Sequence, residues 1–180
     1  MATFTPLLNL RKPDPTELVN VITDLNENFD KLDTLGSTVG GGAWIAYTPV
    51  WGNVGGALPA IGNGILVGKY QRVGKTLDCF VYLQMGSTTT YGAGGSPWNF
   101  SLPSGMLCGD RTRYVPAGML LVAGKWCPAI INLPAGGSVF QVYTYTNPTT
   151  LHELGSTEPS IPAVWANGHV MNLNFRVEIA

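Results

Sequence analysis

Charged side chains are scarce in this chain of 180 residues. Only 12% of its residues are Asp, Glu, Lys or Arg, about half the share found in an average globular protein. A soluble chain with so few charges usually hides part of its surface in an assembly. The basic residues do not gather into the Lys and Arg clusters that bind a phosphate backbone, so we expect no nucleic-acid partner.

The chain is also poor in cysteine and has no long apolar run. Its three cysteines, Cys79, Cys108 and Cys127, are odd in number and show no C-x-x-C spacing. We therefore predict buried free thiols in a protein made in a cytosol, rather than a disulfide scaffold. No run of about 18 apolar residues and no basic, apolar leader occurs, so we expect no insertion into a membrane.

Groups that carry catalysis are few after Gly42. The histidines, His152 and His169, lie far apart and lack metal-ligand spacing. No close carboxylate pair, G-x-S-x-G elbow or complete G-x-x-x-x-G-K-[ST] phosphate loop occurs. We expect no catalytic residue, no metal and no cofactor. The acids in this part of the chain are Asp78, Asp110, Glu153, Glu158 and Glu178.

One segment, residues 14–36, has the pattern of a helix. Asp14 is placed as an N-cap, Pro15 falls at the first helical position, and Glu17 completes a capping box. Gly36 and the glycines at 40–42 mark its end. Apolar residues recur at spacings of 4, 3, 4 and 3, which is a coiled-coil a/d pattern. They are Leu18, Ile22, Leu25, Phe29 and Leu32.

A lone helix of this length with a narrow apolar stripe is marginal in water, so the stripe needs a partner. Either the helix packs on the rest of its own chain, or it packs on copies of itself. The glycine-rich joint at 37–43 favours copies, because a helix docked on its own domain needs no swivel. The residues alone leave two strands and three strands open.

Residues 44–180 read as an antiparallel β-sandwich or jelly-roll-like head. Apolar and polar residues alternate from Met171 to Ile179, and two extended runs flank a hairpin turn at Val73-Gly74-Lys75. Gly and Pro turns separate the other short strands, and no helical crossover intervenes. Those further strands are predicted at Trp44–Val50, Phe100–Leu102, Tyr114–Val122, Ala129–Leu133 and Val139–Tyr145.

The loop Gly86–Trp98 is the best candidate for a binding site in the head. It is small, polar and glycine-rich, and long loops on a rigid β-scaffold often carry recognition. Aromatic rings beside hydroxyls suit the faces and edges of sugars. The alternative is a loop tip with no role, whose last residue packs into the core. The predicted glycan contacts are Tyr91, Trp98, Ser87, Thr88 and Thr89. A second, weaker candidate is "PAVWANGHV", with Trp165 and His169.

Residues 1–13 read as an extended peptide that anchors the protein to a larger structure. Pro6 and Pro13 disfavour a helix there. Apolar residues without a periodic pattern suit a groove on another protein; the alternative is a frayed terminus. The apolar residues are Phe4, Leu7, Leu8 and Leu10.

Two stretches resemble a known class of proteins. "LNLRKPDPTELVNVITDLNENFDKLD" is similar to the N-terminal segments of tail-fibre and minor tail proteins of bacteriophages, especially those of actinobacteria. "YTPVWGNVGGALPAIGNGILVGKYQRVGKTLDCFVYLQMGSTTTYG", followed by "WNFSLP", resembles their C-terminal head modules.

The resemblance implies a homotrimer in the virion, with an N-terminal attachment, a short coiled-coil stalk and a distal β-head that meets the host surface or decorates the capsid. The chain lacks a collagen run, shaft repeats and a chaperone tail, which favours a short spike or head fibre over a long tail fibre. A polysaccharide depolymerase domain of a tail spike and a soluble trimeric lectin remain the alternatives.

Overall fold

The computed structural model describes residues 3–5, 9–39, 43–95, 97–146 and 153–180. Internal contacts divide the chain into two compact units, Met1–Gly42 and Ala43–Ala180. The division lies next to the predicted start of the head at residue 44. Each unit is described by itself.

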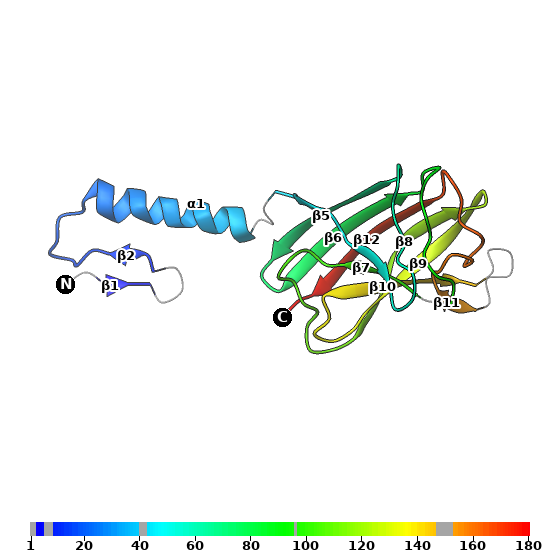
Figure 1. The fold of residues 1–180 in the computed structure, drawn as a ribbon. Helices are drawn as coiled ribbons and strands as arrows, with labels where there is room; N and C mark the ends of the chain where they lie inside the picture. Colours follow the sequence, from blue (N-terminus) through cyan, green and yellow to red (C-terminus); the bar gives the residue numbers. More distant parts are fainter. Residues whose placement is uncertain (1–2, 6–8, 40–42, 96, 147–152) are drawn as a thin grey trace. The chain divides into compact units, whose positions relative to one another are not determined.

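The smaller unit consists of a short hairpin and one helix (Figure 1). Strands β1 (Thr3–Phe4) and β2 (Arg11–Lys12) pair antiparallel. A π-helical turn, η1 (Val21–Asn26), leads directly into the α-helix α1 (Glu27–Val39).

The helix begins later than its sequence signals predicted. The Asp14 carboxylate accepts from the Thr16 N–H at 3.1 Å and Glu17 reaches back to the Asp14 N–H at 3.2 Å, but these bonds close only a single turn. The N-cap is Asn20, whose side-chain oxygen accepts from the N–H groups of Ile22 and Thr23 at 2.9 and 3.3 Å. The prediction of a helix from residue 14 is therefore wrong, and Gly36 lies inside α1 rather than at its end.

The late start changes the predicted apolar row. Leu18 precedes the helix and is 93% exposed. Ile22 and Leu25 lie in the π turn, which has more residues per turn than an α-helix and so shifts their phase relative to Phe29 and Leu32. The part of the row that lies within α1 is Phe29 and Leu32.

The N-terminal segment folds back on the helix, which corrects the prediction of a free extended peptide. The Asn28 side chain accepts from the Arg11 N–H at 2.8 Å and donates to the Arg11 carbonyl at 2.9 Å. Lys31 donates to the Asn9 carbonyl at 2.7 Å and lies over the Phe4 ring. Phe4 is 54% exposed and Leu10 is half-buried, whereas the predicted anchor residues Leu7 and Leu8 lie outside the described residues.

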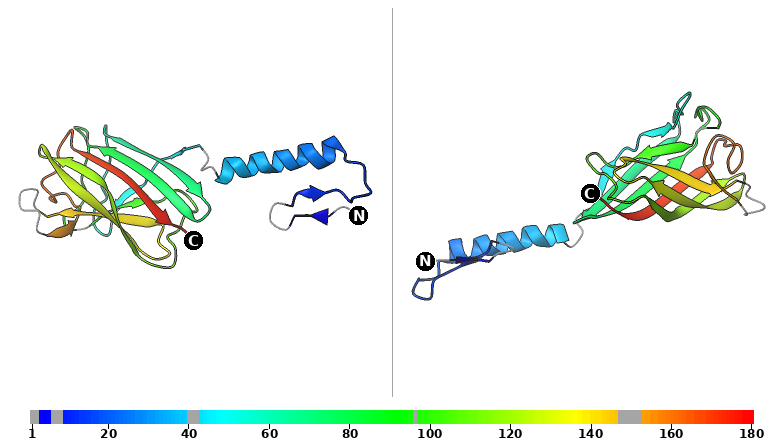
Figure 2. Two further views of the ribbon diagram at one scale, coloured as in Figure 1. Left: turned by 180° about the vertical axis from the view of Figure 1, so that it is seen from behind. Right: turned by 90° about the horizontal axis from the view of Figure 1, so that it is seen from below.

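The larger unit is built from one curled antiparallel sheet, a half-barrel (Figures 1 and 2). Its strand order is β3-β5-β6-β12-β8-β9-β10-β7-β4, with β11 paired to β10. The strands are β3 (Ile45–Tyr47), β4 (Trp51–Asn53), β5 (Ile65–Val73), β6 (Thr76–Gln84), β7 (Trp98–Ser101), β8 (Arg113–Val122), β9 (Lys125–Leu133), β10 (Val139–Tyr145), β11 (Leu154–Ser156) and β12 (Val170–Glu178).

The alternation of apolar and polar residues explains where the long strands β6 and β12 form. In β6 and β12 every second side chain is buried, and the two strands pair along their whole length from Val170↔Gln84 to Glu178↔Thr76. The predicted hairpin at 73–75 is confirmed, with Gly74 at a φ of 57°. The mainly β prediction is thus confirmed, although the pattern missed β4 and β11.

A single sheet replaces the two separate sheets of the predicted sandwich. Its two edge strands, β3 and β4, follow each other in the chain with only residues 48–50 between them. The sheet must therefore curl until its edges nearly meet. Ser101 bonds to this connection, because its N–H donates to the Val50 carbonyl and its hydroxyl accepts from the Val50 N–H.

The curled sheet encloses an aromatic core. Phe140 packs between Phe100 and Phe175, with ring centroids 5.7 and 4.9 Å away. The ring centroid of Trp98 lies 4.9 Å from that of Trp51 and 5.1 Å from that of Trp165. The three cysteines are buried free thiols, as predicted.

Candidate functional site

The predicted recognition loop, 86–98, is fixed to the body at both ends. Trp98 is fully buried, and its indole N–H donates to the Tyr91 carbonyl at 3.1 Å. The Tyr91 ring lies against Trp98 with nearly parallel planes, and burial raises the pKa of Tyr91. Trp98 thus anchors the loop base in the core, so the prediction that it contacts a sugar is wrong, and one face of Tyr91 is already covered.

Asn63 organises the other end of the loop. Its side chain donates to the Ser87 hydroxyl at 2.9 Å and accepts from the N–H and hydroxyl of Thr88 at 2.9 and 3.0 Å. The turn that carries Asn63 needs glycine on its N-terminal side, because Gly62 has a φ of 58° and a Cβ there would collide with the Thr88 carbonyl. The sequence identified this segment as a turn but not as part of a site.

The threonine hydroxyls predicted to bind sugar are engaged within the protein. Thr89 is buried, and its hydroxyl donates to the Ile61 carbonyl at 2.6 Å while accepting from the Gly86 N–H at 2.8 Å. The Thr88 hydroxyl is shared with Asn63. These two side chains shape the loop, whereas Ser87 of the predicted set lines a pocket.

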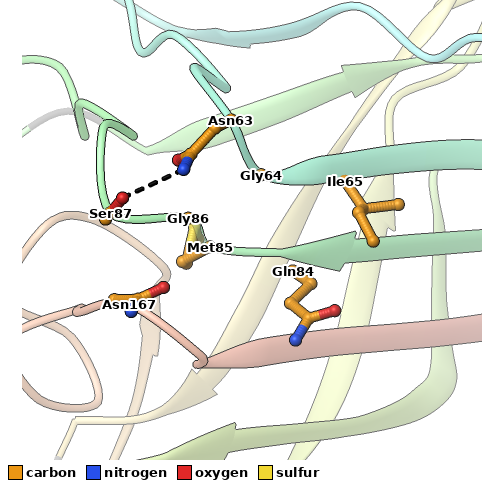
Figure 3. Close-up of a pocket in the computed structure, with 8 residues that line it drawn as sticks. All are labelled: Asn63, Gly64, Ile65, Gln84, Met85, Gly86, Ser87 and Asn167. Atoms are coloured by element: carbon orange, nitrogen blue, oxygen red, sulfur yellow. Dashed lines mark hydrogen bonds between the residues drawn. The ribbon is translucent and has the colours of Figure 1, made fainter.

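That pocket has a volume of about 310 Å³ and lies where the 86–98 loop meets the second candidate segment, 162–170 (Figure 3). The segments are joined by backbone bonds, since the Met85 N–H donates to the His169 carbonyl and the Gly168 N–H to the Met85 carbonyl. No charged side chain is among its lining residues: Asn63, Gly64, Ile65, Gln84, Met85, Gly86, Ser87 and Asn167.

The chemistry of this pocket is that of neutral hydrogen bonding. The Asn and Gln amides each offer donors and an acceptor, and a serine hydroxyl offers both. Such groups match the hydroxyls of an uncharged, polyhydroxylated ligand. Sequence reasoning missed Asn63, Gln84 and Asn167, which come from three separate parts of the chain and share no local motif.

The two aromatic residues of the second segment have structural roles. Trp165 is buried and donates to the Ile161 carbonyl at 2.9 Å. The His169 ring accepts from the Ala166 N–H at Nδ1, and its Nε2 faces the Ala123 N–H at 3.1 Å. Burial lowers the pKa of His169, so its neutral form prevails at neutral pH. Neither residue lines the pocket.

Burial holds the three thiols in their neutral form. Burial raises the pKa of Cys79 to about 11, and its sulfur lies 3.2 Å from the Tyr47 hydroxyl. Burial likewise raises the pKa values of Cys108 and Cys127. Among the described residues, no three His, Cys, Asp or Glu side chains form a metal-binding group. In the same part of the chain, no helix is both long and apolar enough to cross a membrane.

A second candidate site lies on the helix of the smaller unit. There the hairpin covers the polar side: Asp24 is buried and ion-paired with Arg11, and Asn28 and Lys31 hold the strand beside it. The adjacent apolar side, about 100° further round the helix, is open, with exposures of 42% for Leu25, 63% for Phe29 and 40% for Leu32. The apolar row is therefore exposed in the single chain.

Comparison of the chain with models of protein families, with curated proteins and with solved structures finds no match.

Proposed function

We propose that this chain is a structural protein of a bacteriophage virion: a homotrimeric short fibre or spike that attaches through its N-terminal unit and presents its β-body to carbohydrate on the host surface. The observation that carries the proposal is the bare apolar row of α1. Its own hairpin packs on the adjacent polar side of the helix, through Arg11, Asp24 and Asn28, so the exposed row stays available to other copies.

The resemblance of the N-terminal stretch and the head to phage tail-fibre and minor tail proteins supports the virion setting. The 12% share of charged residues supports an assembly. Attachment is assigned to the N-terminal hairpin, where Phe4 is exposed at its start. Immunogold labelling of particles with antibody to this chain tests the setting, and a chain that labels no virion would overturn it.

Self-association is tested by light scattering on the full chain at micromolar concentration. We expect a mass three times the 19.2 kDa of one chain. Phe29→Asp places a charge in the row and should weaken the assembly at least tenfold, whereas Asn26→Asp adds the same charge at an exposed position beside the row. A monomeric wild type would refute the trimer.

Carbohydrate binding is assigned to the uncharged pocket at Asn63, Gln84, Ser87 and Asn167. A shallow polar site binds one sugar weakly, and several heads on one particle turn weak contacts into adhesion. Asn167→Ala should lower binding of the full chain to immobilised neutral oligosaccharides several-fold. Asn174→Ala changes the same residue type on the exposed face of β12 and should not.

Unchanged binding by Asn167→Ala would exclude this pocket and return attention to Tyr91. Release of new reducing ends from the oligosaccharide would instead indicate a depolymerase. Binding by a wild-type chain that labels no virion would indicate a soluble lectin.

A further inference from the structure

Three tryptophans are buried in the core of the larger unit, and their indole N–H groups are treated differently. Trp98 donates to the Tyr91 carbonyl at 3.1 Å, and Trp165 donates to the Ile161 carbonyl at 2.9 Å. Trp51 is 7% exposed, and its indole N–H has no acceptor among the described residues. Because a buried donor without a partner is costly, this N–H is a binding group for an acceptor from outside the chain.

Trp51 lines a second pocket of the same unit, which has a volume of about 370 Å³. We call it the Trp51 pocket. It lies beside residues 48–50, the connection between the end strands β3 and β4 of the sheet path. Thr48 contributes a hydroxyl, and no charged side chain is among the lining residues. Its apolar wall is formed by Pro49, Pro59, Ile61 and Leu66.

The Trp51 pocket adjoins the uncharged pocket that the proposed function assigns to carbohydrate. Gly64 lines both pockets, and Figure 3 shows it beside Asn63 where the chain enters β5. A Cβ at Gly64 would collide with the Gln84 carbonyl at 2.5 Å and would lie 2.9 Å from Ile61 Cδ1. Gly64 therefore packs between a residue of one pocket and a residue of the other, and one small ligand can reach into both.

We propose that the Trp51 pocket binds the acetamido group of a 2-acetamido sugar, while the uncharged pocket binds hydroxyls of the same saccharide. This inference rests on the carbohydrate binding in the proposed function and names the class of sugar. The Trp51 indole N–H donates to the acetamido carbonyl, and the Thr48 hydroxyl accepts from the acetamido N–H. The methyl group lies against the apolar wall.

The groups of the Trp51 pocket select an acetamido group over the other substituents of sugars. A hydroxyl would accept from the indole N–H but would leave the apolar wall facing a polar group. A hydrocarbon chain would cover the wall but would leave the N–H without an acceptor. A carboxylate would meet no cationic side chain in either pocket. An acetyl ester has the carbonyl and the methyl but no N–H for Thr48. The acetamido group alone among these carries all three features.

Isothermal titration of the full chain with a matched pair of trisaccharides tests the proposal. Triacetylchitotriose and cellotriose share ring configuration and linkage, and differ at C2, where one carries an acetamido group and the other a hydroxyl. The wild type should bind triacetylchitotriose about tenfold more tightly, because a hydrogen bond from a buried donor and the burial of one methyl group together contribute about that factor.

Two variants locate the preference in the Trp51 pocket. Thr48→Val removes a hydroxyl at an exposed position with little change of shape, and should reduce the preference several-fold. Trp51→Phe removes the indole N–H and should abolish it. Trp126→Phe makes the same change at a residue of β9 that is 60% exposed, and should leave both affinities unchanged. Since Trp51 packs in the core, urea unfolding checks that its variant folds, and Thr48→Val decides the test if it does not.

The indole N–H resonance of Trp51 in a heteronuclear NMR spectrum gives an independent measurement. Triacetylchitotriose should shift it, and cellotriose should not. A preference for the acetamido sugar that leaves this resonance in place and survives Thr48→Val overturns the role of the Trp51 pocket.

The remaining outcomes separate this inference from the proposed function. Binding of neutral oligosaccharides with no preference for the acetamido sugar overturns the inference and leaves the proposed function standing. A wild type that binds no neutral oligosaccharide overturns the carbohydrate binding itself. Binding of a proline-rich peptide, but of neither trisaccharide, would assign the Trp51 pocket to a peptide and overturn both.

Discussion

The two units of this chain treat their apolar residues in opposite ways. In the β-body, alternation directs them inward, and β6 and β12 bury every second side chain. In the helical unit, the chain's own hairpin covers Asp24 and Asn28 while Phe29 and Leu32 stay exposed. The body completes its core within one chain. The helix has a covered polar side and an exposed apolar side in the single chain.

The same substitution in each region gives the largest contrast. Phe140→Ala removes a fully buried ring between Phe100 and Phe175 and should lower the free energy of unfolding of the body by about 3–5 kcal/mol. Phe29→Ala removes a ring that is 63% exposed in the single chain and should change the free energy of unfolding of the body by less than about 0.5 kcal/mol. Urea unfolding followed by fluorescence of the buried tryptophans measures both. Similar losses would erase the contrast.

A smaller effect is expected where the hairpin meets the helix. Asn28→Ala removes two hydrogen bonds to the backbone of Arg11 and should weaken the docking by about 1–2 kcal/mol. Amide hydrogen exchange reports it directly, because the Arg11 N–H is one of the lost donors. Protection of that amide should fall about tenfold or more. Asn26→Ala, at an exposed helical position, is the matched control. An equal loss of Arg11 amide protection in both variants would contradict the role of Asn28 in holding the hairpin.

The smallest effect concerns pH and the loop beside the pocket. Burial lowers the pKa of His169 below its usual value near 6.5, so the unfolded chain binds the proton more readily than the folded one. The stabilising contribution of neutral His169 is complete above about pH 6.5 and is lost as the pH falls through the lowered folded value. Protonation also sets a ring N–H against the Ala123 or Ala166 N–H.

Urea midpoints at pH 7.5 and 5.0 test this expectation. The drop between the two should be larger for the wild type than for His169→Gln, which cannot titrate. An equal drop in both proteins would remove His169 as the cause.

Residue patterns predicted the strands better than they predicted the site. Alternation is a local property, so β10 and β12 could be found from their own sequences. The strand β4 is short, and its pairing with β7 depends on the curl of the whole sheet. The helix start was missed because the segment holds two possible N-caps, Asp14 and Asn20. In the fold, where the hairpin docks at Asn28, Asn20 is the N-cap.

The pocket could not be predicted because its side chains come from distant segments. Asn63, Gln84 and Asn167 meet only after β6 and β12 have paired. Trp98 shows the converse error, since an aromatic residue at the end of a polar loop suits either a ligand or the core. Its burial depends on Trp51 and Trp165, which the local sequence does not reveal.

The short edge strands have a consequence for a protein present in many copies. An exposed sheet edge is a template on which another chain can add a strand, and few charges would be available here to prevent it. Among the described residues, the strands at the two ends of the long sheet path are β3 and β4, each three residues long and joined through residues 48–50. These end strands offer only short templates for a further strand, which makes it harder for crowded copies to grow into fibrils through them.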